Sequence, residues 1–132
     1  MQFSHTSQLF ETDRSLVEHF FDAVISLDIA LNVTFWNFGA ELIFGYTKQQ
    51  AIGTSIDLLL DCESATMVKN VIDKLHDNHE WRGEFLHRRL DNRLISCMLS
   101  ISVVKRPNYQ DEYLIIARDI SEKKELEILL NN

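Results

Sequence analysis

The chain has 132 residues, of which 45% are hydrophobic and 25% charged, so its composition is that of one ordinary globular domain. Its formal net charge is -7, and an acidic surface of this kind repels the phosphate backbone of nucleic acids. No apolar run approaches the ~20 residues that a membrane-spanning helix needs, and the first residues show no export signal. We therefore expect a cytoplasmic protein whose partner is neither a nucleic acid nor a membrane.

Apolar residues change their spacing along the chain and so predict an order of helices and strands. The stretch 12–22 is expected to form an amphipathic helix, because Leu16, Val17, Phe20 and Phe21 recur at helical spacing. The elements expected after it are strands over 23–28 and 32–37, short helical pieces over 38–60, a long helix over 63–78, strands over 81–90, 93–105 and 112–119, and a helix over 121–130. This order indicates one α+β domain with an antiparallel sheet.

Alternation along the last three expected strands divides the sheet into two faces. One face carries Gly83, Phe85, His87, Cys97, Leu99, Ile101, Val103, Tyr113, Ile115 and Ala117. The opposite face carries Leu86, Met98, Leu114 and Ile116. This opposite face is too apolar to remain in water, since a large apolar patch usually marks a contact surface. We expect the Leu16, Val17, Phe20 and Phe21 stripe to cover it, from the same chain or from a second copy.

Several short motifs, in this order and spacing, resemble the PAS domain family over about residues 22–124. The segments VISLD and VTFWN resemble its first hairpin, and Ala40-Glu41 with Phe44-Gly45-Tyr46-Thr47 resembles the helix and turn that follow. The remaining matches are Ala51-Ile52-Gly53, Trp81-Arg82-Gly83-Glu84-Phe85, the basic hairpin His87–Arg93 and the strand end Ala117–Ser121. The sequence departs from the family pattern at Leu31 and Asn92, which replace hairpin glycines, and at Ser121, which replaces a threonine.

The resemblance implies a five-stranded antiparallel sheet with short helices on one face, and a sensory module of bacterial signalling such as two-component systems. It divides the chain into a cap helix over 1–21, a core over 22–120 and the start of a signalling or coiled-coil helix over 121–132. It further implies a homodimer, signal relay through Asp119, Ile120 and Ser121, and a kinase or cyclic-dinucleotide output domain on the same or another chain. A ligand site is implied on the face toward the helices, at Phe85, His87, Cys97, Leu99, Ile101, Tyr113, Ile115 and Ala117.

No cofactor is identified by the resemblance. Haem-binding members carry a histidine inside the long helix, whereas residues 63–75 contain none and His76 and His79 come too late. Members of the light-sensing LOV branch attach flavin within an Asn-Cys-Arg-Phe-Leu-Gln run, of which only Cys62 remains. Members similar to photoactive yellow protein need a phenol and a carboxylate where this chain has Trp36 and Ala40. We therefore expect neither haem nor LOV-type flavin, and we expect Cys62 and Cys97 to be reduced and buried.

Two questions stay open at the level of sequence. A small apolar ligand and a filled, ligand-free core that serves only pairing are predicted equally well by the interior residues. His87 is either an inward-facing, ligand-contacting or pH-sensitive group, or a half-solvated histidine near the end of its strand. No metal site is expected because no CxxC or HxxxH spacing occurs, and no catalytic residue is expected because the inward list contains no acid.

Overall fold

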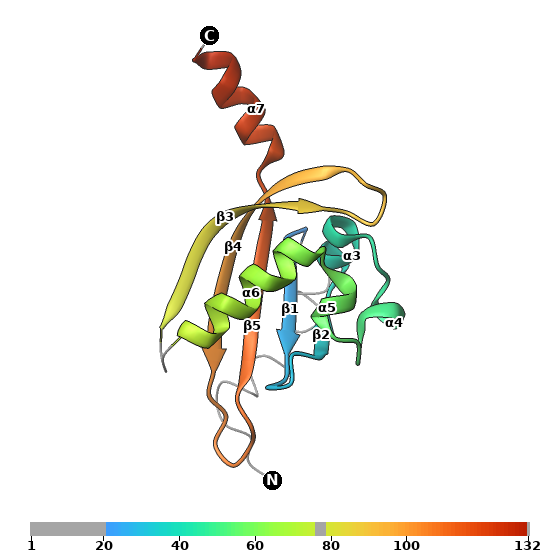
Figure 1. Cartoon of the computed structure of the whole chain (residues 1–132), viewed down its shortest axis with the longest axis vertical. Helices are drawn as coiled ribbons and strands as arrows, with labels where there is room; N and C mark the ends of the chain where they lie inside the picture. The colour runs from blue at the N-terminus through green and yellow to red at the C-terminus, as the bar shows by residue number, and fades with distance from the viewer. Residues whose placement is uncertain (1–20, 76–78, 132) are drawn as a thin grey trace.

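The computed structural model describes residues 21–75 and 79–131 of the chain. Its strands form one five-stranded antiparallel sheet in the order β2-β1-β5-β4-β3, so that β5 is the middle strand and β2 and β3 are the edges (Figure 1). The strands are β1 (Ala23–Leu27), β2 (Val33–Trp36), β3 (Glu80–Arg88), β4 (Leu94–Val104) and β5 (Glu112–Asp119). The fold class predicted from the sequence is confirmed.

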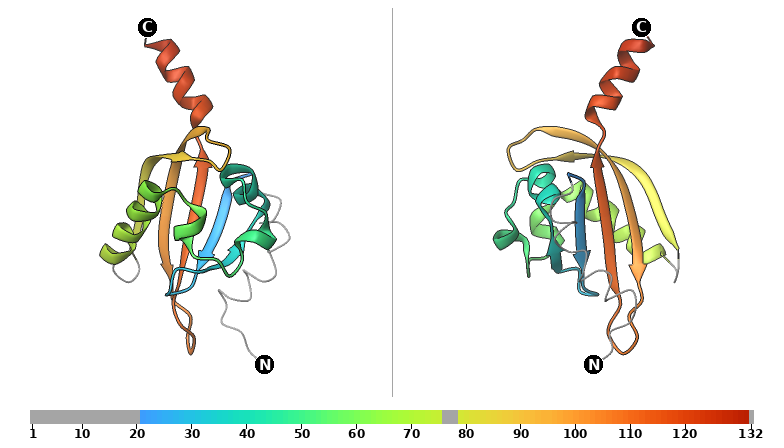
Figure 2. Two further views of the ribbon diagram at one scale, coloured as in Figure 1. Left: turned by 45° about the vertical axis from the view of Figure 1, so that its right-hand side comes forward. Right: turned by 180° about the vertical axis from the view of Figure 1, so that it is seen from behind.

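In the part of the chain that the structure describes, four helices cover one face of this sheet, and a fifth projects from it (Figures 1 and 2). They are α3 (Phe38–Phe44), α4 (Lys48–Ala51), α5 (Ile56–Leu59), α6 (Cys62–Lys74) and α7 (Ser121–Leu130). Each of the first four begins after a side chain that accepts a backbone N–H of the first turn, from Asn37, Thr47, Ser55 and Asp61 in turn. These caps explain why the segment 38–59 is divided into the three short helices α3, α4 and α5, and why α6 begins as a separate helix after them.

The long helix is shorter than predicted, because the expectation of residues 63–78 is wrong at its C-terminal end. α6 ends at Lys74, and Leu75 is already extended, with φ -72° and ψ 132°. This conformation returns the Leu75 side chain to the edge of the apolar core, which a further helical turn would not do. His79 follows outside any helix, so it does not share a helical face with another histidine.

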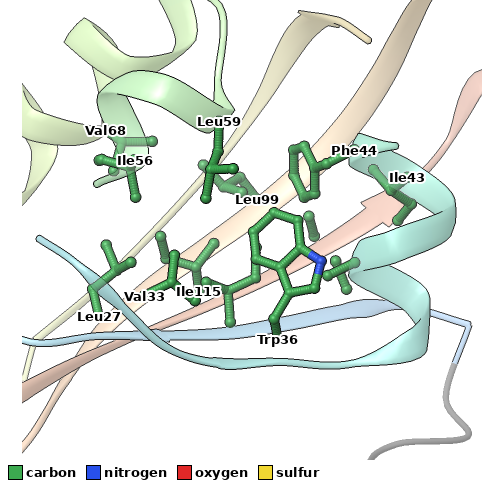
Figure 3. Close-up of a cluster of buried hydrophobic side chains, with 14 of the residues drawn as sticks. Leu27, Val33, Trp36, Ile43, Phe44, Ile56, Leu59, Val68, Leu99 and Ile115 are labelled. Atoms are coloured by element: carbon green, nitrogen blue, oxygen red, sulfur yellow. The ribbon is translucent and has the colours of Figure 1, made fainter. Parts of the chain in front are cut away.

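The core lies between the helix-covered face of the sheet and the helices themselves (Figure 3). Trp36 and Phe44 contact each other there, with ring centroids 5.7 Å apart. The other large aliphatic side chains of this cluster are Ile25, Leu27, Val33, Ile43, Ile56, Leu59, Val68, Ile72, Ile95, Leu99, Ile101 and Ile115. Since each buried side chain of this size contributes roughly 1.5–3 kcal/mol, their packing is the main stabilising term of the fold.

Both departures from the family's glycines adopt the backbone conformation that glycine would supply. Leu31 has φ 68° and Asn92 has φ 71°. The first of these turns is stabilised by Asp28, whose carboxylate accepts the N–H groups of Ala30 at 3.0 Å and Asn32 at 2.9 Å. A local hydrogen-bonding side chain therefore holds the hairpin in a conformation that Leu31 alone would disfavour.

The right-hand view of Figure 2 shows the face of the sheet that is turned away from the helices. The alternation of buried and exposed positions along the strands puts the expected apolar residues on this face. Leu86, Met98 and Ile116 are exposed there, and Leu114 is half-buried. The predicted cover, with Leu16, Val17 and Phe20, lies outside the described residues. Phe21 is described and is 76% exposed. The expectation that this stripe covers the face, from the same chain or from a second copy, stays a prediction.

Within the described residues, no helix is long and apolar enough to cross a membrane.

Candidate functional site

The residues predicted to line a ligand site all lie on the helix-covered face of the sheet. Strict alternation places them there, because Phe85 and His87 on β3 point opposite to the exposed Glu84, Leu86 and Arg88. His87, Cys97, Leu99, Ile101, Ile115 and Ala117 are buried, whereas Phe85 and Tyr113 are partly buried against the same core. The structure thus brings these residues together on one surface.

Packed side chains leave almost no free volume in this interior. A cavity of only about 10 Å³ lies between Trp36, Phe44, Phe85, Leu99 and Ile115. A single water molecule needs roughly 10–15 Å³ by this measure. A small organic molecule could therefore enter only if these side chains moved.

His87 is the residue of this interior that titrates nearest to neutral pH when exposed, and it is 1% exposed. The interpretation as a half-solvated histidine is therefore wrong. Its Nδ1 lies 3.4 Å from the Ser64 hydroxyl oxygen and 3.7 Å from a carboxylate oxygen of Asp61. Its ring meets Phe44 edge-on, at 4.8 Å between centroids. Its Nε2 is buried and has no hydrogen-bond partner among the described residues.

The charge state of His87 follows from this setting. Burial lowers the pKa of His87 below its ordinary value of 6.5; the Asp61 carboxylate opposes this shift and the Arg89 guanidinium adds to it. The imidazole is therefore neutral at neutral pH. Its Nδ1 can then accept the Ser64 hydroxyl hydrogen while Nε2 keeps its own proton beside the Phe44 ring.

Asp61 is the site residue that the sequence analysis missed. One of its carboxylate oxygens accepts the N–H of Ser64 at 2.7 Å and so caps α6, and the other accepts the N–H of Arg88 at 2.7 Å. Burial alone would raise the pKa of Asp61, but these backbone donors outweigh it and hold the pKa below its usual range. The sequence did contain a signal, because an aspartate three residues before a serine at the start of an apolar stripe is a typical helix N-cap.

The two cysteines lie in different surroundings. Cys97 is fully buried, as predicted, and burial, with a smaller contribution from Asp119, raises its pKa to about 12. Cys62 is exposed at the first residue of α6, so the expectation that it is buried is wrong. The physical reason is that Cys62 and Glu63 lie on the solvent side of the first turn of α6, whereas Ser64 and Ala65 of the same turn face the interior.

The end of the middle strand is joined to the neighbouring strand and to the projecting helix by a compact set of bonds. The N–H of Ile120 donates to the Ser96 carbonyl at 2.8 Å, and the N–H of Ser96 donates to the Ser121 hydroxyl oxygen at 3.1 Å. The Asp119 carboxylate accepts the N–H of Ser121 at 2.9 Å. Further along α7, Lys124 pairs with Glu84 of β3 at 2.6 Å. The predicted relay residues Ile120 and Ser121 therefore connect α7 to β4, and Lys124, which was not predicted, connects it to β3.

A second connection joins the beginning of β1 to the end of β5. Arg118 donates from two nitrogens to the Asp22 carboxylate, at 2.9 to 3.3 Å. Since Ala23 pairs with Ala117, this ion pair lies at the end of the sheet from which α7 leaves. The start of β1 therefore lies at the same end of the sheet as the base of α7.

The remaining hollows of the described part lie on its outside. A groove of about 560 Å³ is lined by α6 and Trp81, with Met67, Val71 and Leu75 as its apolar residues. Among the described residues, no cluster of three or more metal-binding side chains occurs.

This fold and these sequence features identify the family. A sequence profile described as PAS domain matches residues 22–122, and the chain belongs to this family. A search among curated proteins finds no match. PAS domains are typical sensory modules of signal-transduction proteins, and that coarse description applies to this chain.

Solved structures share the fold. The PAS domain of a protein from Colwellia psychrerythraea has a TM-score of 0.74 and 26% identity, over 86% of this chain and 98% of that one. A PAS domain from a two-component sensor histidine kinase has a TM-score of 0.68 and 12% identity, over 87% of this chain and 99% of that one. The LOV protein of Rhodobacter sphaeroides has a TM-score of 0.67 and 22% identity, over 86% of this chain and 68% of that one.

Likeness to a LOV protein raises the question whether the interior fits a flavin. It does not fit in the described conformation, because the cavity of about 10 Å³ is far smaller than a ring system, and ligand pockets measure ~300–1,000 Å³. Cys62, the remaining candidate for a covalent bond, is exposed and is absent from the residues that line the cavity.

Proposed function

We propose that the chain is a non-catalytic signal-input module that pairs with a second copy and passes changes of its sheet through α7 to an output domain. That output domain is a kinase or a cyclic-dinucleotide enzyme, on the same chain or on a partner. The proposal rests on how the sheet continues into the helix, and it agrees with the fold shared with a PAS domain of a sensor histidine kinase.

The direct path from the middle strand into α7 is the observation that carries this proposal. β5 pairs with both β1 and β4, and only Ile120 separates its last residue from α7 (Figure 1). A shift of β5 against β4 therefore changes the distance between Ser96 and Ser121 at the base of the helix. A switch of this kind needs a stimulus that binds two states of the sheet with different affinity.

Pairing is supported by apolar side chains that the described chain leaves in water. No residue of α7 is buried, and Leu126, Leu129 and Leu130 are each more than half exposed. A helix of this length is marginal by itself, because isolated helices shorter than ~12–15 residues are not stable in water. Packing against a second α7, and of the exposed Leu86, Met98 and Ile116 against a second copy, would remove this apolar surface from water.

A fusion to a reporter histidine kinase tests the relay. Asp119→Ala removes the carboxylate that accepts the Ser121 N–H, and we expect it to change the autophosphorylation rate of the fusion. The matched control is Asp73→Ala, an exposed aspartate on α6, which should leave the rate unchanged. An unchanged rate in the Asp119 variant, with the fold intact by circular dichroism, would count against the relay.

Sedimentation velocity tests the pairing separately. The double substitution Leu126→Glu and Leu129→Glu should shift the protein from dimer to monomer, whereas Glu122→Gln on the same helix should not. A parent protein that remains a monomer at high concentration contradicts the proposed pairing.

The second candidate, a pairing scaffold without a ligand, is favoured by the filled interior. A core with a free volume of about 10 Å³ needs no ligand for its packing. Native mass spectrometry and a visible absorption spectrum of freshly purified protein distinguish the two. Extra mass or colour selects the ligand-sensing module, and a dimer with polypeptide mass alone selects the scaffold.

We also place the module in the cytoplasm. The exposed Cys62 has no disulfide partner, and a free surface thiol persists best in a reducing compartment.

A further inference from the structure

His87 combines deep burial with an unsatisfied polar atom, which is uncommon in a packed core. It is 1% exposed, and its Nε2 lacks a hydrogen-bond partner among the described residues. Buried polar atoms are nearly always paired, so an exception of this kind calls for an explanation. The proposed signal-input function does not use this atom.

Polar and charged groups meet His87 from a few elements only. The first turn of α6 supplies Asp61 and Ser64, whose oxygens lie 3.7 Å and 3.4 Å from Nδ1. Arg89, the residue just after β3, supplies a guanidinium that disfavours a second positive charge. Cys97 of β4, which pairs with Phe85, lies on the same inward face, and its thiol stays neutral because burial raises its pKa to about 12. α3 supplies only the ring of Phe44.

Asp61 connects this histidine to the contact between α6 and the edge strand. It bonds the first turn of α6 through the Ser64 N–H and the end of β3 through the Arg88 N–H. The N–H of Arg88 points outward from β3, which is an edge strand, so no neighbouring strand accepts its hydrogen bond. The Asp61 carboxylate accepts it instead. A group that changes the position of Asp61 therefore acts on both elements at once.

We propose that Asp61, Ser64 and His87 form a proton-operated latch between α6 and β3, closed while the imidazole is neutral and opened when it binds a proton. In the closed state, Nδ1 accepts the Ser64 hydroxyl hydrogen. A proton from solvent that binds the Nδ1 lone pair displaces this hydrogen bond and leaves an imidazolium with two N–H donors. Its Nε2–H then has no acceptor beside Phe44, and a buried charge without full hydrogen bonding is strongly disfavoured.

The nearest charged group toward which the imidazolium can turn is the Asp61 carboxylate, 3.7 Å from Nδ1. Asp61 also lines a hollow of about 350 Å³ where the start of α6 meets the end of β3, together with Glu63 and with Arg88 of the outer face of β3. A turn of the ring past Asp61 toward this hollow brings its charge to water, to two anions and to one cation. The Asp61 carboxylate then turns from the Arg88 N–H toward the imidazolium. The volume beside Phe44 that the His87 ring had filled becomes free space in the interior.

The difference between the pKa of His87 in the closed state and in the open state sets how strongly pH changes the opening equilibrium. The open state has a histidine of ordinary pKa and the closed state a histidine of lowered pKa. Between these two values the opening equilibrium rises by about tenfold for each unit of pH decrease, since one unit of pH then corresponds to one proton taken up. Above the ordinary value near 6.5, opening does not depend on pH.

NMR on the whole chain tests the latch. We expect the His87 ring and the Arg88 amide to titrate with one common midpoint below pH 6.5. The hydrogen-exchange protection factor of the Arg88 amide should fall by about tenfold per pH unit in that range. The Ile101 amide, on the buried strand β4, serves as an internal control and should keep its protection. An Arg88 amide that stays unchanged while the His87 ring titrates would overturn the proposal.

Two substitutions separate the latch from general acid effects. His87→Phe keeps an aromatic ring against Phe44 and should abolish the titration of the Arg88 amide. Asp61→Asn keeps an N-cap oxygen but removes the charge that favours the imidazolium, so the midpoint of the His87 titration should move to lower pH. An unchanged midpoint in the Asp61 variant, or a persistent Arg88 titration in the His87 variant, contradicts the proposal. Either variant alone is sufficient if the other fails to fold.

Discussion

The Ser121 hydroxyl oxygen accepts the backbone N–H of Ser96 at 3.1 Å, and this bond links the first residue of α7 to strand β4. The neighbouring bond from the Ile120 N–H to the Ser96 carbonyl, at 2.8 Å, completes the pair. Ser121 makes this bond although it lies beyond the end of β5. The connection between β5 and β4 is thereby extended by a side chain into the helix.

Loss of this hydroxyl should weaken the fold by a measurable amount. Ser121→Ala leaves the part-buried Ser96 N–H without an acceptor, so we expect the free energy of unfolding to fall by about 1 kcal/mol. Urea denaturation followed by circular dichroism measures the change. Ser121→Thr retains a hydroxyl and should match the parent protein; equal stability of the alanine variant would show that the bond does not contribute.

Stability should also depend on pH through His87. Its pKa is lowered in the folded state, mainly by burial, so the unfolded chain binds the proton at a higher pH than the folded chain. The free energy of unfolding is therefore fully retained above about pH 6.5 and decreases as the pH falls from there through the folded-state pKa. Urea unfolding at several pH values between 7.5 and 5 measures this slope. The slope should be smaller in His87→Phe, and an identical slope in both proteins would exclude His87 as its source.

The sheet could be predicted from the sequence because alternation of side chains needs no tertiary information. Phe85 and His87 on one face and Leu86 on the other follow from the two-residue period alone. The family resemblance then told which face meets the helices. Leu31 and Asn92 were accepted as turn residues in place of glycine, and both have positive φ. The two faces of the sheet and the turn positions could therefore be predicted from the sequence.

What the sequence did not reveal depends on distances between segments that are far apart in the chain. Asp61 lies 27 residues before Arg88, and nothing in the local pattern indicates that its carboxylate bonds the edge strand as well as its own helix. Cys62 was expected inside because cysteine is commonly buried, but it lies on the solvent side of the first turn of α6. The free volume of the core depends on rotamers from several elements, so a list of apolar residues cannot distinguish a pocket from a filled interior.

Reactivity of the two thiols should differ sharply in the folded protein. Cys97 is fully buried and its pKa is raised to about 12, so almost none of it is thiolate, the reactive form, near pH 8. We expect iodoacetamide to modify Cys62 alone under native conditions and both cysteines in urea, as measured by intact mass. In Cys62→Ser, native protein should remain unmodified. Rapid modification of that variant would show that the core around Cys97 opens more readily than the packing implies.

Two glycines offer a matched test of close packing against backbone strain. A Cβ on Gly39, in α3, would overlap the backbone of the residues just before β1, with 2.6 Å to the carbonyl oxygen of Phe21. Backbone atoms cannot move aside as a flexible side chain can, so Gly39→Ala must push α3 away from the start of β1. Overpacking of this kind costs about 1–3 kcal/mol or more, and we expect the upper part of that range.

Gly53 is the control for this test, because a Cβ there meets no atom within 4 Å, although its φ of 82° is unfavourable for other residues. Gly53→Ala should therefore lose only the conformational strain, about 1–2 kcal/mol. Urea denaturation of both variants measures the difference. Since the Asp22–Arg118 ion pair is next to the displaced backbone, Gly39→Ala should also shift the Arg118 side-chain NMR signals, and Gly53→Ala should not. A larger loss in the Gly53 variant would mean that strain, and not contact with the strand, decides the stability at these positions.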